Sequence, residues 1–146
     1  MITPTKYQQT QVMTASPMEL IVMMYDECIT TLEKAEKSFE HVSDGPDRIQ
    51  ALNNTLLHAE DIISELAISL DMERGGEIAK NLHRLYDFMI YYLSQANTKQ
   101  ILKPIVEVRK MMVELRQSWQ KVAIQEPARE EDAENVPLRG GILVNG

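Results

Sequence analysis

The apolar residues of this chain recur in alternating steps of three and four along four long stretches, a spacing that keeps one helix face apolar. The first stretch follows Ser16, which can cap a helix start, and Pro17, which suits the first helical position. Glu19 completes a capping box with Ser16. We therefore expect a helix that begins near Pro17 and ends before the turn signal Asp44-Gly45-Pro46. Its apolar seam is Ile21, Tyr25, Cys28, Leu32, Ala35 and Phe39.

A second helix is expected after this turn, with Asp47 as its cap and Gln50 as the partner of the cap. Its seam is Ile49, Leu52, Leu56, Ala59, Ile63, Leu66 and Leu70. The pattern then breaks at Gly75 and Gly76, because two glycines are unfavourable inside a helix. We expect this pair to be a structural loop, in which glycine can adopt the left-handed conformation that ends a helix.

Two further seams complete the pattern. The third is Ile78, Leu82, Leu85, Met89, Tyr92 and Ala96. The fourth is Ile105, Val108, Met112, Leu115, Trp119 and Val122. Pro104 should lie in the first turn of the fourth helix, because proline lacks the backbone N–H that a helix interior needs. Four such helices joined by short connections predict an all-α fold, an antiparallel four-helix bundle over residues 16–122.

Two segments flank the predicted bundle. Residues 1–15 are polar with a few apolar points (Ile2, Tyr7, Val12 and Met13). We expect this N-terminal segment to pack on the bundle as a weak cover over an apolar groove. Residues 123–146 form an acidic tail whose cluster at 130–134 is typical of a solvated, flexible segment that folding does not need. The final "ILVNG" is apolar enough to dock, although nothing in the sequence fixes where.

The charge and composition of the chain argue against several classes of binding partner. The formal net charge of −7 disfavours nucleic acid and anionic lipid, which both call for a basic face. No apolar run approaches the roughly 20 residues that a membrane-spanning helix needs, so membrane insertion is not expected. The first nineteen residues do not resemble a secretory signal, and we therefore expect a cytoplasmic protein. Nine methionines favour adaptable contacts, either in the core or at a binding surface.

No motif for catalysis, a metal or a cofactor stands out. The Glu-x-x-His pattern of di-iron bundles precedes none of the three histidines. His83 and Asp87 could share a metal, but a solvated helix face explains this pair more simply. Cys28 lies on the first seam and should be an inert buried thiol. The sequence therefore predicts a non-enzymatic protein without metal or cofactor, and a bundle enzyme that handles metal or phosphate finds no supporting motif.

Several helices carry more apolar residues than one bundle stripe requires. Ala79, Tyr86 and Ile90 lie beside the third seam, and Val106, Met111 and Val113 lie beside the fourth. This surplus could belong to a broad core, or it could form a groove for an amphipathic helix of a partner. It could also let copies of the chain assemble into a structural bundle without cargo. A monomer or a weak homodimer is expected for the free protein.

Three segments resemble the FliS family of flagellar secretion chaperones: "VMTASPMELIVMMYDECI" (12–29), "IISELAISLDMERGGEIAKNLHRLYDFMIYYLSQAN" (62–97) and "VRKMMVELRQSW" (108–119). The resemblance covers about residues 7–122. It implies a cytoplasmic four-helix bundle that binds the C-terminal segment of flagellin and keeps it from polymerising. It also implies delivery of this cargo to the gate protein of the flagellar type III export apparatus.

The apolar residues on and beside the third and fourth seams are the candidates for the contact with this cargo. The candidate cargo-binding residues are Tyr86, Met89, Ile90, Val106, Met112 and Val113. Docking to the export gate would use Tyr7 and Ile2, because Pro4 stands where many members of the family carry a second large apolar residue.

Overall fold

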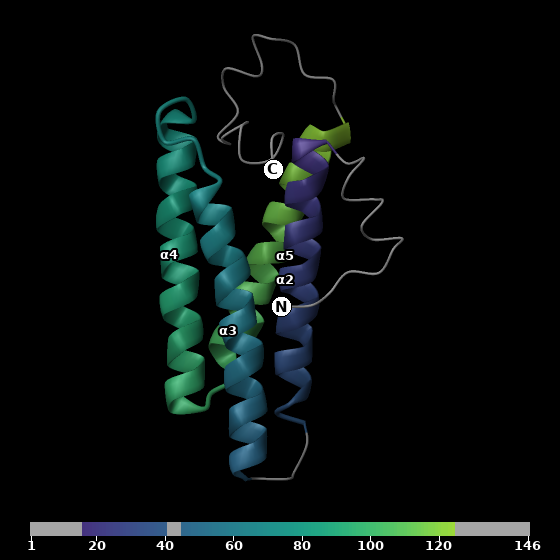
Figure 1. The fold of residues 1–146 in the computed structure, drawn as a ribbon, viewed down its shortest axis with the longest axis vertical. Coiled ribbons are helices and arrows are strands. Elements are labelled where there is room, and N and C mark those ends of the chain that lie inside the picture. Colours follow the sequence, from purple (N-terminus) through teal and green to yellow (C-terminus); the bar gives the residue numbers. More distant parts are fainter. Residues whose placement is uncertain (1–15, 41–44, 125–146) are drawn as a thin grey trace.

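The described residues of the computed structural model, 16–40 and 45–124, form four long helices that run alternately up and down (Figure 1). The helices are α2 (Pro17–Lys37), α3 (Pro46–Ile68), α4 (Gly76–Lys99) and α5 (Lys103–Ile124). This arrangement confirms the predicted all-α helical bundle. The expected packing of residues 1–15 on the bundle, and the expected nature of the tail beyond residue 124, concern residues outside the described ones.

The helices are arranged as a square. α2 packs against α3 and α5, and α4 packs against the same two helices, so α2 and α4 lie diagonally opposite each other. The interface between α4 and α5 is the least extensive of the four neighbouring pairs. The helices α4 and α5 therefore cover less of each other than the other neighbouring pairs do.

The start of α2 follows the sequence prediction, because Ser16 Oγ accepts a hydrogen bond of 3.2 Å from the backbone N–H of Glu19. The start of α3 differs from the prediction. Gly45, and not Asp47, is the residue before the helix, and Pro46 is its first residue. Proline is preorganised for this position, which shifts the start by two residues and leaves Asp47 inside the first turn. Gln50 donates to Asn54 and not to a capping residue.

The core contains most of the first, second and fourth predicted seams. Ile49 and Val122 are exceptions, since both lie near the end of a helix and are exposed. Phe39 lies just beyond the end of α2 and is half-buried. The fully enclosed residues of these three helices include Ile21, Tyr25, Cys28, Leu32, Leu52, Leu56, Ala59, Ile63, Ile105, Val108 and Met112.

The face of α4 that is buried is not the face that the sequence predicted to be buried. The buried residues of this helix are Ala79, Tyr86, Met89, Leu93 and Ala96, whereas Ile78 is 61% exposed and Leu85 and Tyr92 are half-buried. The sequence contains two apolar series that share Leu82, Met89 and Ala96 and differ by one residue at the other positions. Because both series have the same spacing, periodicity could not choose between them.

The two glycines belong to the start of α4. Gly75 precedes the helix with right-handed backbone angles, and Gly76 opens it with a φ of 55°. The loop before them is closed by Asp71, whose Oδ1 accepts from the backbone N–H groups of Glu73 and Arg74 at 3.1 and 2.9 Å. Only Gly76 therefore requires the conformational freedom of glycine, because positive φ is unfavourable for residues with a Cβ.

Replacing Gly76 with valine should lower the free energy of unfolding by about 1–2 kcal/mol, the usual cost of the left-handed conformation for an L-residue. A Cβ at this position would meet no atom within 4 Å, so the cost arises from the backbone alone. Gly76→Asn is the matched control and should cost less, because asparagine tolerates positive φ. Urea unfolding followed by circular dichroism measures the difference. Equal stability of Gly76→Val and the parent would contradict the proposed constraint.

Candidate functional site: an apolar strip on α4 and α5

The six predicted cargo-binding residues do not share one surface. Tyr86, Met89 and Met112 are at most 1% exposed and belong to the core, so a direct contact with cargo would require the bundle to open. Ile90, Val106 and Val113 are half-buried.

These three half-buried residues lie on different edges of the bundle. Ile90 precedes Asn97 by two helical turns, and Asn97 donates to Asn53 of α3, which places Ile90 on the α3 side of α4. Val106 and Val113 each lie three residues before an arginine, Arg109 or Arg116, that pairs with α2. A single groove cannot contain both groups.

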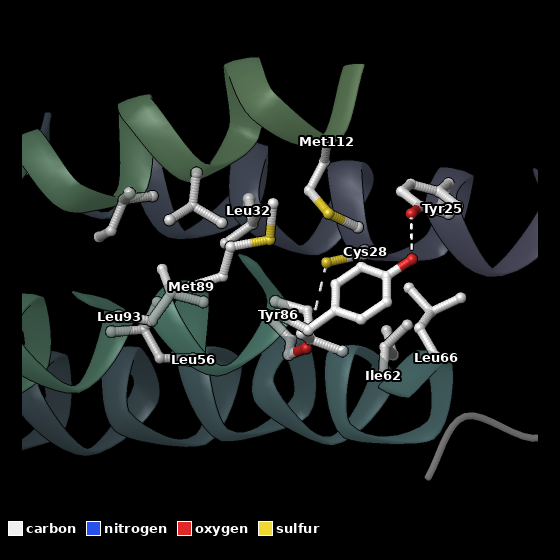
Figure 2. Packing of buried hydrophobic residues seen from close by; sticks show 14 of the residues in the cluster. Tyr25, Cys28, Leu32, Leu56, Ile62, Leu66, Tyr86, Met89, Leu93 and Met112 are labelled. Carbon is white, nitrogen blue, oxygen red and sulfur yellow. Dashed lines mark hydrogen bonds between the residues drawn. The ribbon is translucent and has the colours of Figure 1, made fainter. Parts of the chain in front are cut away.

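A chain of buried hydrogen bonds determines which face of α4 is turned inward. The hydroxyl groups of Tyr25 and Tyr86 are 2.5 Å apart across the diagonal of the bundle. Trp119 Nε1 donates to the Tyr25 hydroxyl oxygen at 3.1 Å, which connects α5 to the same point. Figure 2 shows the Tyr86 ring in the core with its hydroxyl directed at that of Tyr25. Three helices thus meet at one polar contact within an apolar interior.

The surroundings of this contact keep its groups neutral. Burial raises the pKa of the Tyr25 hydroxyl far above its usual value, and the neighbouring Tyr86 raises it further. Burial also raises the pKa of Tyr86 to about 12. The thiol of Cys28 likewise has its pKa raised to about 12, chiefly by burial. A thiol of this kind is a poor nucleophile, so Cys28 packs in the core as the sequence predicted.

With Tyr86 turned inward, the other apolar series of α4 faces α5 and the outside. Tyr92 donates from its hydroxyl to Glu107 Oε2 of α5 at 2.7 Å, which sets the antiparallel register of the two helices. The Phe88 ring stacks on the Tyr92 ring with a centroid separation of 5.2 Å. Phe88 is 45% exposed and Tyr91 is 61% exposed, although both are large aromatic residues.

The same side of α5 carries apolar residues at matching heights. Met111 and Leu115 follow Glu107 by one and two helical turns and are half-buried, and Val122 lies two turns further along. Given the register set by Tyr92 and Glu107, Val122 lies level with Ile78 at the far end of α4. We call this surface the α4/α5 strip. Its members are Ile78, Leu85, Phe88, Tyr91, Tyr92, Met111, Leu115 and Val122.

The opposite edge of α5 is closed by ion pairs. Arg109 Nε lies 2.5 Å from Glu36 Oε2, and Arg116 pairs with Asp26, so two arginines bridge α5 to α2. Their aliphatic stems cover apolar surface while their charged heads remain accessible to water. The α2/α5 edge is thus polar and bridged, in contrast to the α4/α5 strip.

The sequence signal for the strip was present in "FMIYY" (88–92), where three aromatic residues occur within five positions. Phe88 and Tyr91 were overlooked because they belonged to neither expected seam, and Tyr92 was assigned to the core.

Metal and membrane sites find no support in the described residues. Within residues 16–40 and 45–124 there is no group of three or more His, Cys, Asp or Glu side chains that could hold a metal ion. His83 and Asp87 form a pair of 3.2 Å on an exposed face, as expected for a solvated helix surface. None of the described helices is both long and apolar enough to span a bilayer.

Comparison with known proteins gives a consistent result. The family described as "Flagellar protein FliS" matches residues 2–126. The flagellar secretion chaperone FliS of Bacillus subtilis (strain 168) is 35% identical over 121 residues, which are 83% of this chain and 85% of the relative. FliS of Salmonella typhimurium is 35% identical over 116 residues, 79% of this chain and 82% of the relative. FliSB of Pseudomonas aeruginosa is 33% identical over 122 residues, which are 81% of this chain and 93% of the relative.

Removing the hydroxyl of Tyr25 or of Tyr86 from the buried hydrogen-bond chain should destabilise the fold. The loss of stability should be larger for Tyr25. Tyr25→Phe leaves both Trp119 and Tyr86 without their partner, whereas Tyr86→Phe affects only Tyr25. Each buried group left without a partner costs about 1–3 kcal/mol. Urea unfolding should rank the stabilities as parent, Tyr86→Phe and Tyr25→Phe in decreasing order. Tyr91→Phe, which removes an exposed hydroxyl, is the control that should change little. An equal effect of all three variants would contradict a stabilising hydrogen-bond chain.

Proposed function

Because the chain belongs to the FliS family of flagellar secretion chaperones, we propose that it binds the C-terminal segment of flagellin in the cytoplasm and keeps it unpolymerised until export. Family membership identifies it as a chaperone with a protein cargo and not as an enzyme. The nature of the cargo, its docking surface and its delivery are the parts of the proposal that experiments must decide.

The main support for the proposal is the exposure of large aromatic side chains on the α4/α5 strip. An apolar patch on a soluble protein is typical of a docking site for another protein. Tyr and Phe are enriched at the centres of such interfaces, where they supply large contact areas. The strip also runs along two antiparallel helices, and such a surface suits an amphipathic helix that lays its apolar face between them.

The energetics of this binding mode fit a chaperone that must also release its cargo. A segment that folds on binding typically buries roughly 1,000–3,000 Å², and its ordering costs about 2–5 kcal/mol of the gross interaction energy. The complex therefore protects the cargo without becoming irreversible. Met111 and the tyrosines of the strip are well suited to this role, because methionine adapts to irregular surfaces and tyrosine tolerates a partly wet contact.

Delivery would depend on a different part of the chain. Tyr7 and Ile2 are the candidate contacts with the export gate protein, and both lie outside the described residues. Cargo and gate would then use separate surfaces, so that a loaded chaperone could dock without first releasing flagellin.

The self-assembling alternative uses the same strip, since an exposed apolar face can also receive a second copy. Size-exclusion chromatography with light scattering separates the two cases. A 1:1 complex with a flagellin C-terminal fragment supports the chaperone proposal. A stable homo-oligomer that does not bind the fragment favours a structural bundle.

Polar substitutions on the strip should weaken cargo binding. Phe88→Ser and Tyr91→Ser should each reduce the affinity for the flagellin fragment about tenfold, or about 1.4 kcal/mol. Leu57→Ser is the matched control, because Leu57 is 49% exposed but lies on α3. Isothermal titration at several temperatures measures the affinity and should also give a negative heat-capacity change.

Two outcomes would contradict this prediction. If the parent does not bind the fragment, flagellin is not the cargo. If Leu57→Ser weakens binding as much as Phe88→Ser does, the cargo does not use the α4/α5 strip. Urea unfolding of each variant must first show that its fold is retained, since Phe88 also stacks on Tyr92.

Replacing Tyr7 with alanine should separate delivery from cargo binding. The variant should bind the flagellin fragment with parental affinity but bind the purified export gate protein more weakly, because it lacks the large aromatic contact. Pull-down with preloaded chaperone measures gate binding directly. Unchanged gate binding would remove Tyr7 from the proposed docking surface.

A further inference from the structure

The α4/α5 strip has a candidate occupant within this chain. The strip is left open by the described residues, and a free chaperone with an open apolar surface is liable to aggregate. Near its C-terminal end the sequence contains Ile142, Leu143 and Val144, three large apolar residues between glycine and asparagine. The family match ends at residue 126, so these residues lie beyond the part of the chain that defines the family.

The tail begins at the same end of the bundle as one end of the strip. α5 ends at Ile124, at the same end of the bundle as the start of α4 (Figure 1). The tail therefore begins just after Val122, the last member of the strip on α5. The aromatic centre of the strip lies level with Met111, about 20 Å back along α5 at 1.5 Å per residue.

The length of the tail matches this distance. Residues 125–141 connect the end of α5 to the apolar triplet. A flexible linker of this size has a root-mean-square span of about 21–25 Å, by the relation of 5–6 Å times the square root of its length. A linker whose span matches the separation of two sites gives the highest effective concentration, on the order of millimolar. Even a weak contact of three side chains can then occupy the strip.

The charges also favour this arrangement. The connecting segment contains five acidic residues, at positions 126, 130, 131, 132 and 134, and two arginines, Arg129 and Arg139, so its net charge is −3. Arg84 lies two helical turns before Tyr91 on the same face of α4, is exposed, and makes no ion pair within the part of the chain that the structure describes. Lys121 is exposed at the end of α5, one residue before Val122. An acidic linker passing between them would be attracted at low salt.

We propose that residues 142–144 dock on the α4/α5 strip of the free protein and leave it when cargo binds. The role of this docking rests on the proposed function, because the tail then competes with flagellin for one surface. The apparent cargo affinity is reduced by the fraction of molecules in which the strip is open. A tail that occupies the strip nine-tenths of the time therefore weakens cargo binding about tenfold.

The first test uses the full chain without cargo. A triple variant, with Ile142→Ser, Leu143→Ser and Val144→Ser, is compared with the parent by two-dimensional amide NMR. The proposal expects shifts at residues 78–92 and 111–122 and none on α3. The matched control carries Val136→Ser and Leu138→Ser, which change apolar residues of the same tail outside the docking triplet and should leave the strip unchanged.

Three results of this test would overturn the proposal. The first is identical strip signals in the triple variant and the parent. The second is strip signals that respond to removal of residues 1–11 and not to the triple variant, since the N-terminal segment would then be the occupant. The third is strip signals that depend on protein concentration, which would identify a second copy.

The second test measures cargo affinity by isothermal titration. The triple variant should bind the flagellin fragment several-fold to tenfold more tightly than the parent, while the control variant should match the parent. Equal affinity of triple variant and parent would overturn the competition. If neither protein binds the fragment but the NMR shifts appear, the docking is supported and the proposed flagellin cargo fails instead.

Discussion

The hydrogen bond between Tyr25 and Tyr86 is the constraint on which the rest of the surface depends. It crosses the diagonal of the bundle and is the only described side-chain hydrogen bond between α2 and α4, so it fixes the rotation of α4 about its own axis. A rotation that buried the other apolar series would turn Tyr86 away from Tyr25 and leave buried polar groups without partners, which is costly. Trp119 adds a donor from α5 to the same point. One polar contact thus decides which apolar residues remain outside.

The proposed cargo surface is therefore separate from the residues that form the core. The core is held by residues such as Tyr86, Met89 and Met112, which are enclosed and unavailable to a partner. The α4/α5 strip consists of the other apolar series of α4, of Phe88 and Tyr91, and of residues on the facing side of α5. The proposed docking of cargo on this strip does not require the bundle to open. An apolar surface exposed in the free protein is liable to aggregate, and the proposed docking of residues 142–144 would protect it.

Much of the fold could be predicted from the sequence, because the seams have heptad spacing and the turns contain glycine and proline. Most residues of three of the four seams are buried as predicted, and the start of α2 at Pro17 is confirmed. The rotation of α4 could not be predicted, because its two apolar series have identical spacing and only the distant partners of Tyr86 distinguish them. The candidate cargo-binding residues stay a prediction, although three of them lie in the core. Tyr86 was chosen beside the α4 seam, whereas Met89 and Met112 were members of the predicted seams. Phe88 and Tyr91 were overlooked.

The central claim is that cargo docks on the α4/α5 strip and not on another face of the bundle. Site-specific photo-crosslinking tests it most directly, with a photoreactive amino acid placed in turn at Phe88, Met111 and Leu57 in otherwise unchanged chains. The account predicts crosslinks to the C-terminal segment of flagellin from positions 88 and 111 and none from position 57. Crosslinks from position 57 alone, or with equal yield from all three positions, would contradict it.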